Sequence, residues 1–126
     1  MAIDSAKQKT PWLEAERLRI SKRFELGVGF ETMDDTSDTA ISVELPITYL
    51  DSTTAGGAIA GLTLANGYEG QVKVVILIAD GGDCTLTPAN FFNGTTITFD
   101  DNGDMWMGIF HAGNWYSLGT PTATVS

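Results

Sequence analysis

From residue 24 onward, this chain consists of short runs in which apolar and polar residues alternate, separated by turn-forming residues. In residues 24–31 an apolar side chain stands at every second position, and the alternation returns in residues 41–49. Side chains along a β-strand point alternately to its two faces, so a period of two predicts half-buried strands. Pro46 lacks the backbone N–H that a ladder needs, which predicts an edge strand or a kink in the second run.

Glycine-rich turns divide the C-terminal third into further short strands. Asn93-Gly94 is the strongest of these signals, because asparagine and glycine tolerate the positive φ of a tight reversing turn. Similar turns at residues 80–83, 100–104 and 112–114 set strands roughly 8–12 residues apart, a spacing typical of sandwiches and barrels. We therefore predict an all-β fold in which residues 24–126 form an antiparallel sandwich or a barrel-like head.

Residues 72–79 form the most apolar of these runs, because all of them except Lys73 are apolar. A continuous β-branched run between glycine-rich turns predicts a central strand that is covered on both faces. A second sheet or a subunit interface would supply that cover. We accordingly predict that the protein associates with itself through alternate residues of this run, namely Val72, Val74, Ile76 and Ile78.

The N-terminal segment differs from the rest of the chain in charge. Six of the seven basic residues lie in the first 25 positions, where four acids leave a charge of +2. The remaining residues carry Lys73 against twelve acids, a charge of −11, and so acidic a body is expected to repel nucleic acid. Residues 1–23 are predicted to form an arm, either extended or a short helix opened by Thr10-Pro11.

Length and hydropathy limit the class of protein. A chain of 126 residues with 43% apolar residues is expected to fold as one domain. Its longest apolar run, Val74–Ala79, has six residues, whereas a membrane helix needs roughly 20, so we expect no membrane partner. The first residues lack the apolar core of a secretory signal, and a single cysteine, Cys84, is consistent with synthesis in a reducing cytoplasm.

Side chains with catalytic chemistry are few. The single histidine, His111, lies at a turn between phenylalanine and alanine, and no Gly-x-Ser-x-Gly elbow accompanies it. Cys84 follows Asp83, whose carboxylate favours the thiol over the reactive thiolate. The paired glycines are not followed by the Gly-Lys-Ser/Thr of a phosphate loop. We therefore predict no enzymatic activity, no catalytic residue and no cofactor.

The acidic turn at residues 100–104 is superficially similar to a calcium-binding loop. An EF-hand loop has glycine at position six and glutamate at position twelve. With Asp100 as the first position, glycine falls at position four and His111 at position twelve, so the match fails. Hydrogen bonds from the side chains to the local backbone of a hairpin turn explain the same residues. No spacing of cysteine and histidine fits zinc, and we predict no metal site.

Three aromatic residues near the C-terminus, Trp106, Trp115 and Tyr116, form the remaining candidate ligand surface, for example a groove that binds carbohydrate or peptide. Aromatic side chains also supply much of the buried area of a β core. The alternation does not assign the two tryptophans to a face, so a place in the core and a place on a ligand surface both stay open.

Several short blocks between Leu62 and Gly119 follow one another in a distinctive order: Leu64–Gly67, Glu69–Lys73, Gly81–Asn90, Gly94–Phe99, Gly103-Asp104 and Asn114–Tyr116. Together they resemble a segment of phage virion structural proteins, particularly those of cyanophages and other aquatic phages. The chain departs from this family at Cys84, where a small residue such as alanine is usual, and at Asn66, where aspartate is more frequent. Neither departure disturbs the pattern of turns.

The resemblance implies a component of the virion, on the outer capsid surface. A compact β module preceded by a short arm favours a capsid decoration, or cement, protein that bridges and stabilises major capsid proteins, commonly as a homotrimer. The arm would dock on the shell, and the residues predicted to do so are Trp12, Arg17, Arg19, Lys22 and Arg23. The alternative is an adhesin module of the tail, neck or fibre that binds a host-surface glycan.

Overall fold

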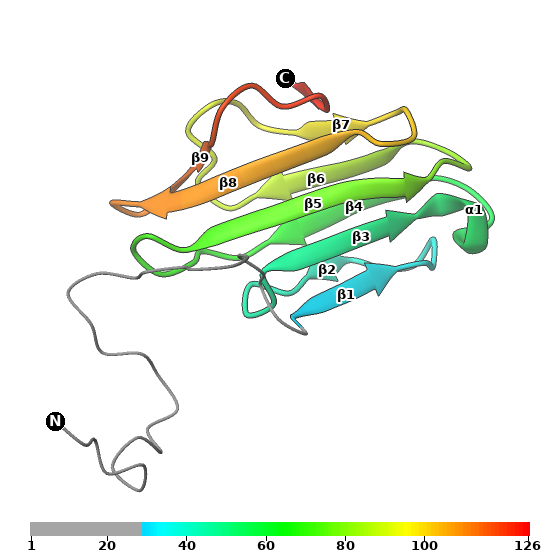
Figure 1. The fold of residues 1–126 in the computed structure, drawn as a ribbon, viewed down its shortest axis with the longest axis horizontal. Coiled ribbons are helices and arrows are strands. Elements are labelled where there is room, and N and C mark those ends of the chain that lie inside the picture. Colours follow the sequence, from blue (N-terminus) through cyan, green and yellow to red (C-terminus); the bar gives the residue numbers. More distant parts are fainter. Residues whose placement is uncertain (1–28) are drawn as a thin grey trace, which may run out of the picture.

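The structure, a computed structural model, describes residues 29–126, which form two sheets packed face to face (Figure 1). Sheet A contains, in spatial order, β1 (Phe30–Met33), β3 (Ile47–Asp51), β5 (Val72–Ala79), β8 (Met105–His111) and β9 (Asn114–Ser117). Sheet B contains β10 (Thr124–Val125), β7 (Ile97–Phe99), β6 (Cys84–Pro88), β4 (Ile59–Leu64) and β2 (Ala40–Ile41). The predicted all-β sandwich is confirmed, and the two sheets do not close into a barrel.

The sheets are mixed rather than antiparallel throughout. Four strand pairs are parallel, namely β1–β3, β3–β5, β2–β4 and β4–β6. From β1 to β6 the chain alternates between sheet A and sheet B, so consecutive strands of one sheet run in the same direction. The prediction of antiparallel pairing is therefore correct only toward the C-terminus, where β6–β7 and β8–β9 pair consecutive strands and β5–β8 and β7–β10 also run antiparallel.

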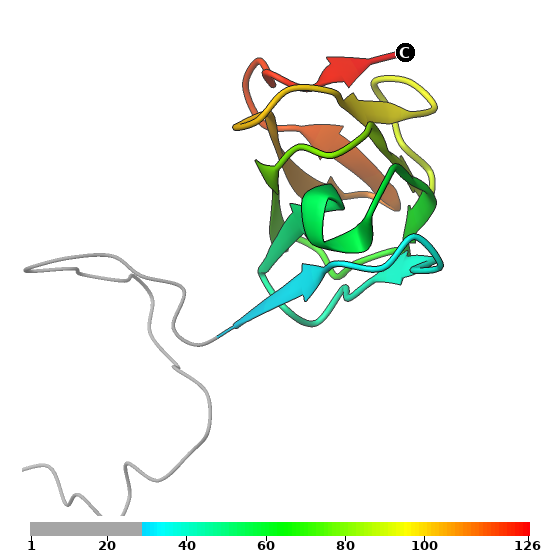
Figure 2. The ribbon, with the colours of Figure 1, turned by 90° about the vertical axis from the view of Figure 1, so that its right-hand side faces the viewer.

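One helical turn, α1 (Ser52–Ala55), was not expected from the sequence and closes one end of the sandwich, the end that faces the viewer in Figure 2. The Asp51 carboxylate caps it by accepting a hydrogen bond of 2.8 Å from the backbone N–H of Thr54. Gly56 ends it in the left-handed conformation, with φ at 84°. The Ser52 hydroxyl then accepts a hydrogen bond of 2.8 Å from the backbone N–H of Gly81, which ties the helix to the turn after β5.

The core lies between the sheets and contains both tryptophans. Trp106 and Trp115 are fully buried, with ring centroids 6.2 Å apart in an edge-to-face arrangement. Each indole N–H is satisfied, because Trp106 donates to the Ser117 hydroxyl and Trp115 donates to the Ala65 carbonyl, both over 2.9 Å. Gly108 lies under the Trp106 ring, where any Cβ would overlap the indole. The tryptophans therefore organise the core and leave no room for a larger residue at Gly108.

Two predicted strands differ in extent from the alternation, and a third strand was not predicted. The predicted strand at 24–31 is described only from Gly29, and β1 begins at Phe30. The run at 41–49 is divided between β2 and β3, with Pro46 directly before β3. β4 lies in residues 51–67, where the sequence shows no clear period. The boundary predicted between an arm and a head, at residues 23 and 24, lies outside the described residues.

Candidate functional site

The two faces of β5 have opposite environments. Lys73, Val75 and Leu77 point inward and are buried against sheet B. The alternate residues point outward, and Val72 and Ile78 are 36% and 46% exposed. The prediction that this strand is central is confirmed, since it is the middle strand of sheet A, and within residues 29–126 a second sheet covers its inner face and not its outer face. Only one sheet packs against β5, because sheet B covers the inner face alone.

The outward residues of β5 continue into apolar rows across the neighbouring strands. In the first row, Phe30 pairs with Ile47, which pairs with Val74, which in turn pairs with Met107. Residues that pair across strands on one face lie in contact distance, so each row is a continuous strip. A second row joins Tyr49, Ile76 and Met105, and a third joins Val72, Ile109 and Tyr116. With Ile78 and Leu118, these residues make up the outer apolar face.

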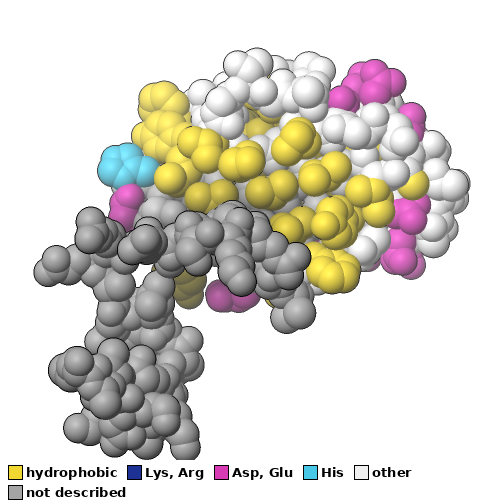
Figure 3. All heavy atoms as spheres, viewed as in Figure 1, with side chains coloured by type: hydrophobic (Ala, Val, Ile, Leu, Met, Phe, Trp, Pro, Cys, Tyr) yellow, Lys and Arg dark blue, Asp and Glu magenta, His cyan; other side chains and the backbone are white. Residues whose placement is uncertain are grey.

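The outer apolar face is the most extended apolar surface visible on this side of the molecule (Figure 3). The four residues predicted to mediate self-association, Val72, Val74, Ile76 and Ile78, all lie on it. The structure thus brings them together on a single exposed surface. Monomeric proteins rarely expose a contiguous apolar surface of more than a few hundred Å², so this face is the candidate interaction surface of the described residues.

The surface around this face is acidic. Residues 29–126 contain twelve carboxylates against one cation, Lys73, and Lys73 is only 1% exposed. The described surface therefore offers no exposed lysine or arginine, and Figure 3 shows carboxylates at the margins of the visible apolar surface. The outer apolar face is a neutral area on a surface that otherwise carries one sign of charge.

Of the two places that the sequence left open for Trp106 and Trp115, the structure shows the core and excludes a ligand surface, because both side chains are fully buried. The register explains their shared orientation. The two-residue turn Ala112-Gly113 has positive φ at both positions and pairs Phe110 with Trp115. Since Phe110 and Trp106 lie on the same side of β8, Trp115 must point inward as well. Counting residues through this turn would have assigned both tryptophans to one face.

Tyr116, the third residue of that prediction, lies on the outer apolar face. Its ring centroid is 4.7 Å from that of Phe92 and 6.2 Å from that of His111. Phe92 is 65% exposed. These side chains extend the outer apolar face at the end of β9, and they do not form an enclosed groove with the tryptophans.

A buried ion pair between Lys73 and Glu31 anchors the edge of sheet A, and only its lysine was noticeable in the sequence, as a lone cation in an apolar run. The Lys73 Nζ atom donates to the Ser42 and Leu45 carbonyls over 2.6 and 2.7 Å and lies 3.9 Å from Glu31 Oε2. Burial lowers the pKa of Lys73 to about 8, and the Glu31 carboxylate partly opposes that shift. Glu31 also accepts a hydrogen bond of 2.8 Å from the backbone N–H of Ser42. The pair holds the segment between β2 and β3 in place.

The candidates for chemistry lie apart from one another. His111 is exposed at the end of β8, with Nδ1 2.7 Å from Glu69 Oε2. The backbone N–H of Ala112 and the His111 ring both donate to Glu69 and lower the pKa of its carboxyl. Cys84 is buried in the core, and that burial raises the pKa of its thiol. His111 and Cys84 belong to different sheets, so the imidazole and the thiol do not form a pair of base and nucleophile.

The acidic turn after β7 is held by local hydrogen bonds. Asp104 Oδ2 accepts hydrogen bonds of 3.1 Å from the backbone N–H groups of both Asp100 and Asp101.

Within residues 29–126, no group of three or more His, Cys, Asp or Glu side chains is placed to hold a metal ion. In the same part of the chain, no helix has the length and apolar character needed to cross a membrane.

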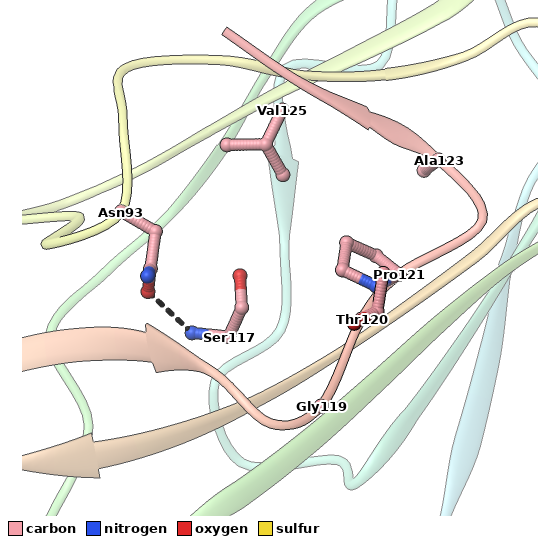
Figure 4. A pocket seen from close by; sticks show the side chains of 7 residues that line it. All are labelled: Asn93, Ser117, Gly119, Thr120, Pro121, Ala123 and Val125. Carbon is pink, nitrogen blue, oxygen red and sulfur yellow. Dashed lines mark hydrogen bonds between the residues drawn. The ribbon is translucent and has the colours of Figure 1, made fainter.

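A shallow hollow of about 440 Å³ opens between β9 and β10 (Figure 4). Asn93 spans one side of it, where its side-chain oxygen accepts a hydrogen bond of 2.8 Å from the Ser117 N–H. The remaining lining comes from Gly119, Thr120, Pro121, Ala123 and Val125. No titratable side chain lines the hollow, so it provides no acid, base or metal ligand.

The residues predicted to dock on a capsid, Trp12, Arg17, Arg19, Lys22 and Arg23, lie outside the described residues. In comparisons with known proteins, no protein-family model matches the chain, and a search of curated proteins finds no significant match.

Proposed function

We propose that this protein is a structural subunit of a virus particle, a capsid decoration protein that bridges and stabilises major capsid proteins. The observation that carries the proposal is the outer apolar face, a surface suited to assembly on a domain whose described residues assemble no catalytic site. The virus setting rests on the resemblance of residues 62–119 to phage virion proteins.

The physical role of a decoration protein is to bury surface between subunits. Each copy bridges its neighbours, and the summed contacts of many copies resist the pressure of the packaged genome. The rows across β3, β5 and β8 supply apolar area for contacts between heads. At about 25 cal/mol per Å² of apolar surface removed from water, even a few hundred Å² per contact is a substantial contribution when repeated over a shell.

The distribution of charge fits the same role. Twelve carboxylates and a single buried cation in residues 29–126 give the head no attraction for packaged nucleic acid. Six of the seven basic residues precede residue 25, so the segment proposed to contact the shell differs in charge from the head. In this proposal, the N-terminal segment binds the major capsid protein and the heads contact each other.

Quantitative mass spectrometry of purified virus particles that contain this chain tests the proposal. A decoration protein is expected in hundreds of copies per particle. A dozen copies or fewer would contradict the proposal and favour the tail, neck or fibre adhesin. The burial of Trp106 and Trp115 removes two of the three residues on which a glycan-binding surface depended.

Binding of the N-terminal segment to the shell is tested by deleting residues 1–23. The truncated chain is expected to lose binding to capsids that lack the protein, while its circular dichroism spectrum stays that of a β protein. A control chain with Arg17, Arg19 and Lys22 replaced by glutamine keeps the length and removes three charges. Undiminished capsid binding by the truncated chain would refute the docking role of this segment.

A further inference from the structure

We propose that two copies of this chain pair through the outer apolar face, sheet A against sheet A, on a twofold axis that passes near Val74 and Ile76 of β5. The proposal rests on the proposed function in one respect, since it takes contact between heads as the role of this face. It adds the identity of the occupant, which is a second copy of the same surface.

Charge selects this face for self-contact. Residues 29–126 carry a charge of −11, and their single cation is buried, so most pairings of two heads bring carboxylates together. Like charges across an interface oppose association, and burying an unpaired carboxylate adds a desolvation cost. In the three rows that cross β3, β5 and β8, every outward residue is uncharged, and the carboxylate of Asp51 lies beyond these rows, at the end of β3 where Asp51 pairs with Ala79. Two copies that meet there avoid the repulsion that opposes other orientations.

The size of the face is sufficient for a pair. Phe30, Ile78 and Leu118 are 55%, 46% and 47% exposed, and the half-buried residues of the rows add to them. The face has twelve residues. At about 50 Å² of exposed surface each, roughly a quarter of what a buried aromatic side chain covers, the face offers roughly 600 Å² per copy. Two copies would then bury roughly 1,200 Å², which exceeds the roughly 1,000 Å² expected of a specific interface.

The position of β5 within sheet A indicates where the twofold axis of the pair passes. In a twofold interface the same surface contacts itself, so a residue near the axis meets its own copy. β5 is the middle strand of sheet A, and Val74 and Ile76 each lie between a residue of β3 and a residue of β8. Sheet faces that pack in this way lie about 10 Å apart with interdigitating side chains. Val74 and Ile76 are therefore expected to contact Val74 and Ile76 of the other copy.

Sedimentation equilibrium and native mass spectrometry of the full chain test the pairing. The unmodified protein is expected at twice its mass of 13.5 kDa. Val74→Glu and Val74→Lys should each weaken pairing at least about 100-fold, because each places like charges together at the axis. A mixture of the two variants, one of them uniformly labelled with ¹⁵N, should pair again as a heterodimer, and the label makes its mass differ from those of both homodimers.

A matched control comes from the other face of the sandwich. Thr87 is exposed on the outer side of β6 in sheet B, so Thr87→Glu adds the same charge away from the proposed interface. This variant should pair as the unmodified protein does. If Val74→Glu fails to fold by circular dichroism, Ile78→Glu replaces it, because Ile78 is 46% exposed and on the same face.

Several results would overturn the pairing. These are a monomeric or trimeric unmodified protein, undiminished pairing of the folded glutamate variant, and a charge-reversed mixture that forms no heterodimer. A monomer would indicate that another occupant, such as residues 1–28 of the same chain, takes the face, and a trimer would agree with the stoichiometry implied by the resemblance. The copy number per particle is measured separately, so a pair at low copy number contradicts the proposed function alone, and a monomer at high copy number contradicts the pairing alone.

Discussion

The outer faces of sheets A and B are built from the same strand geometry but carry different side chains. On sheet B, Ala40, Thr63 and Thr87 form one outward row. A second row joins Thr85, Thr98 and Thr124. The equivalent rows of sheet A consist of valine, isoleucine, methionine and aromatic residues. A sheet that covers a core with one face and meets water with the other normally alternates apolar with polar residues, as sheet B does.

Sheet B shows that a sheet of this sandwich covers the core without an apolar outer face. Both sheets present an apolar inner layer to the shared core, with Leu62 and Leu86 on one side and Val75 and Leu77 on the other. Threonine has a high β propensity and would form the outer rows of sheet A equally well. This contrast supports the proposal that the apolar outer rows of sheet A contact another molecule.

The largest effect on stability is expected from β9, where an inward-facing residue and its outward-facing neighbour are each replaced by alanine. Trp115→Ala should lower the free energy of unfolding by about 3–5 kcal/mol, because the side chain is fully buried and its N–H donates to the Ala65 carbonyl. Tyr116→Ala, on the outer side, should lower it by about 1 kcal/mol or less. Urea denaturation at low protein concentration measures both. Equal losses would mean that the outer side of sheet A is packed within the subunit, which would end the contrast with sheet B.

A smaller effect on stability is expected from Lys73, because this one charged residue of β5 points inward into the core. Burial lowers the pKa of Lys73 to about 8, below the roughly 10.4 of an unfolded lysine. Between these values the unfolded chain binds more protons than the folded chain, so stability should rise with pH by roughly 2 kcal/mol. The desolvation cost of the charged lysine is present below pH 8 and is relieved as pH increases toward 10.4.

Comparison with Lys73→Met isolates this contribution, because methionine does not titrate. Cys84 opposes the trend, since burial raises the pKa of its thiol in the folded state, and both chains should therefore carry Cys84→Ala. Urea denaturation from pH 7.5 to 10.5 then gives the difference in slope. Identical slopes of the unfolding free energy against pH in the two chains would show that Lys73 keeps an ordinary pKa and that water reaches the inner side of β5.

Local signals predicted most of the strands but not their arrangement. The turn at Asn93-Gly94 and the hairpin at 112–114 were identifiable because asparagine and glycine favour particular backbone conformations. The same chemistry is compatible with a turn that reverses within one sheet and with a turn that crosses to the other. The turn at 80–83 crosses from sheet A to sheet B, so the parallel pairs were not predictable from it. Direction depends on contacts that are distant in sequence.

The candidate face was predictable in part. Val72, Val74, Ile76 and Ile78 were identified because β5 is apolar on both sides, and alternation places them together. Their extension into β3 and β8 was not predictable, because it depends on the parallel register of Ile47 with Val74. The buried ion pair was missed for a similar reason. Lys73 is a lone cation among apolar residues, but its partners at Glu31, Ser42 and Leu45 come from segments more than 25 residues away.

The smallest effect on folding is expected when one outward residue of sheet A is replaced by the residue type found on sheet B, or the reverse. Ile78→Thr gives sheet A the residue type of sheet B and should change the free energy of unfolding of the monomer by no more than about 0.5 kcal/mol, because the side chain is 46% exposed. The reciprocal change, Thr87→Ile, should be equally small. Their effects on association should differ: Ile78→Thr should reduce the rise of Tm with protein concentration, since a paired state is stabilised by mass action, and Thr87→Ile should not. A Tm of the unmodified protein that does not depend on concentration would remove the functional distinction between the two faces, because the apolar rows would then have no second copy to bind.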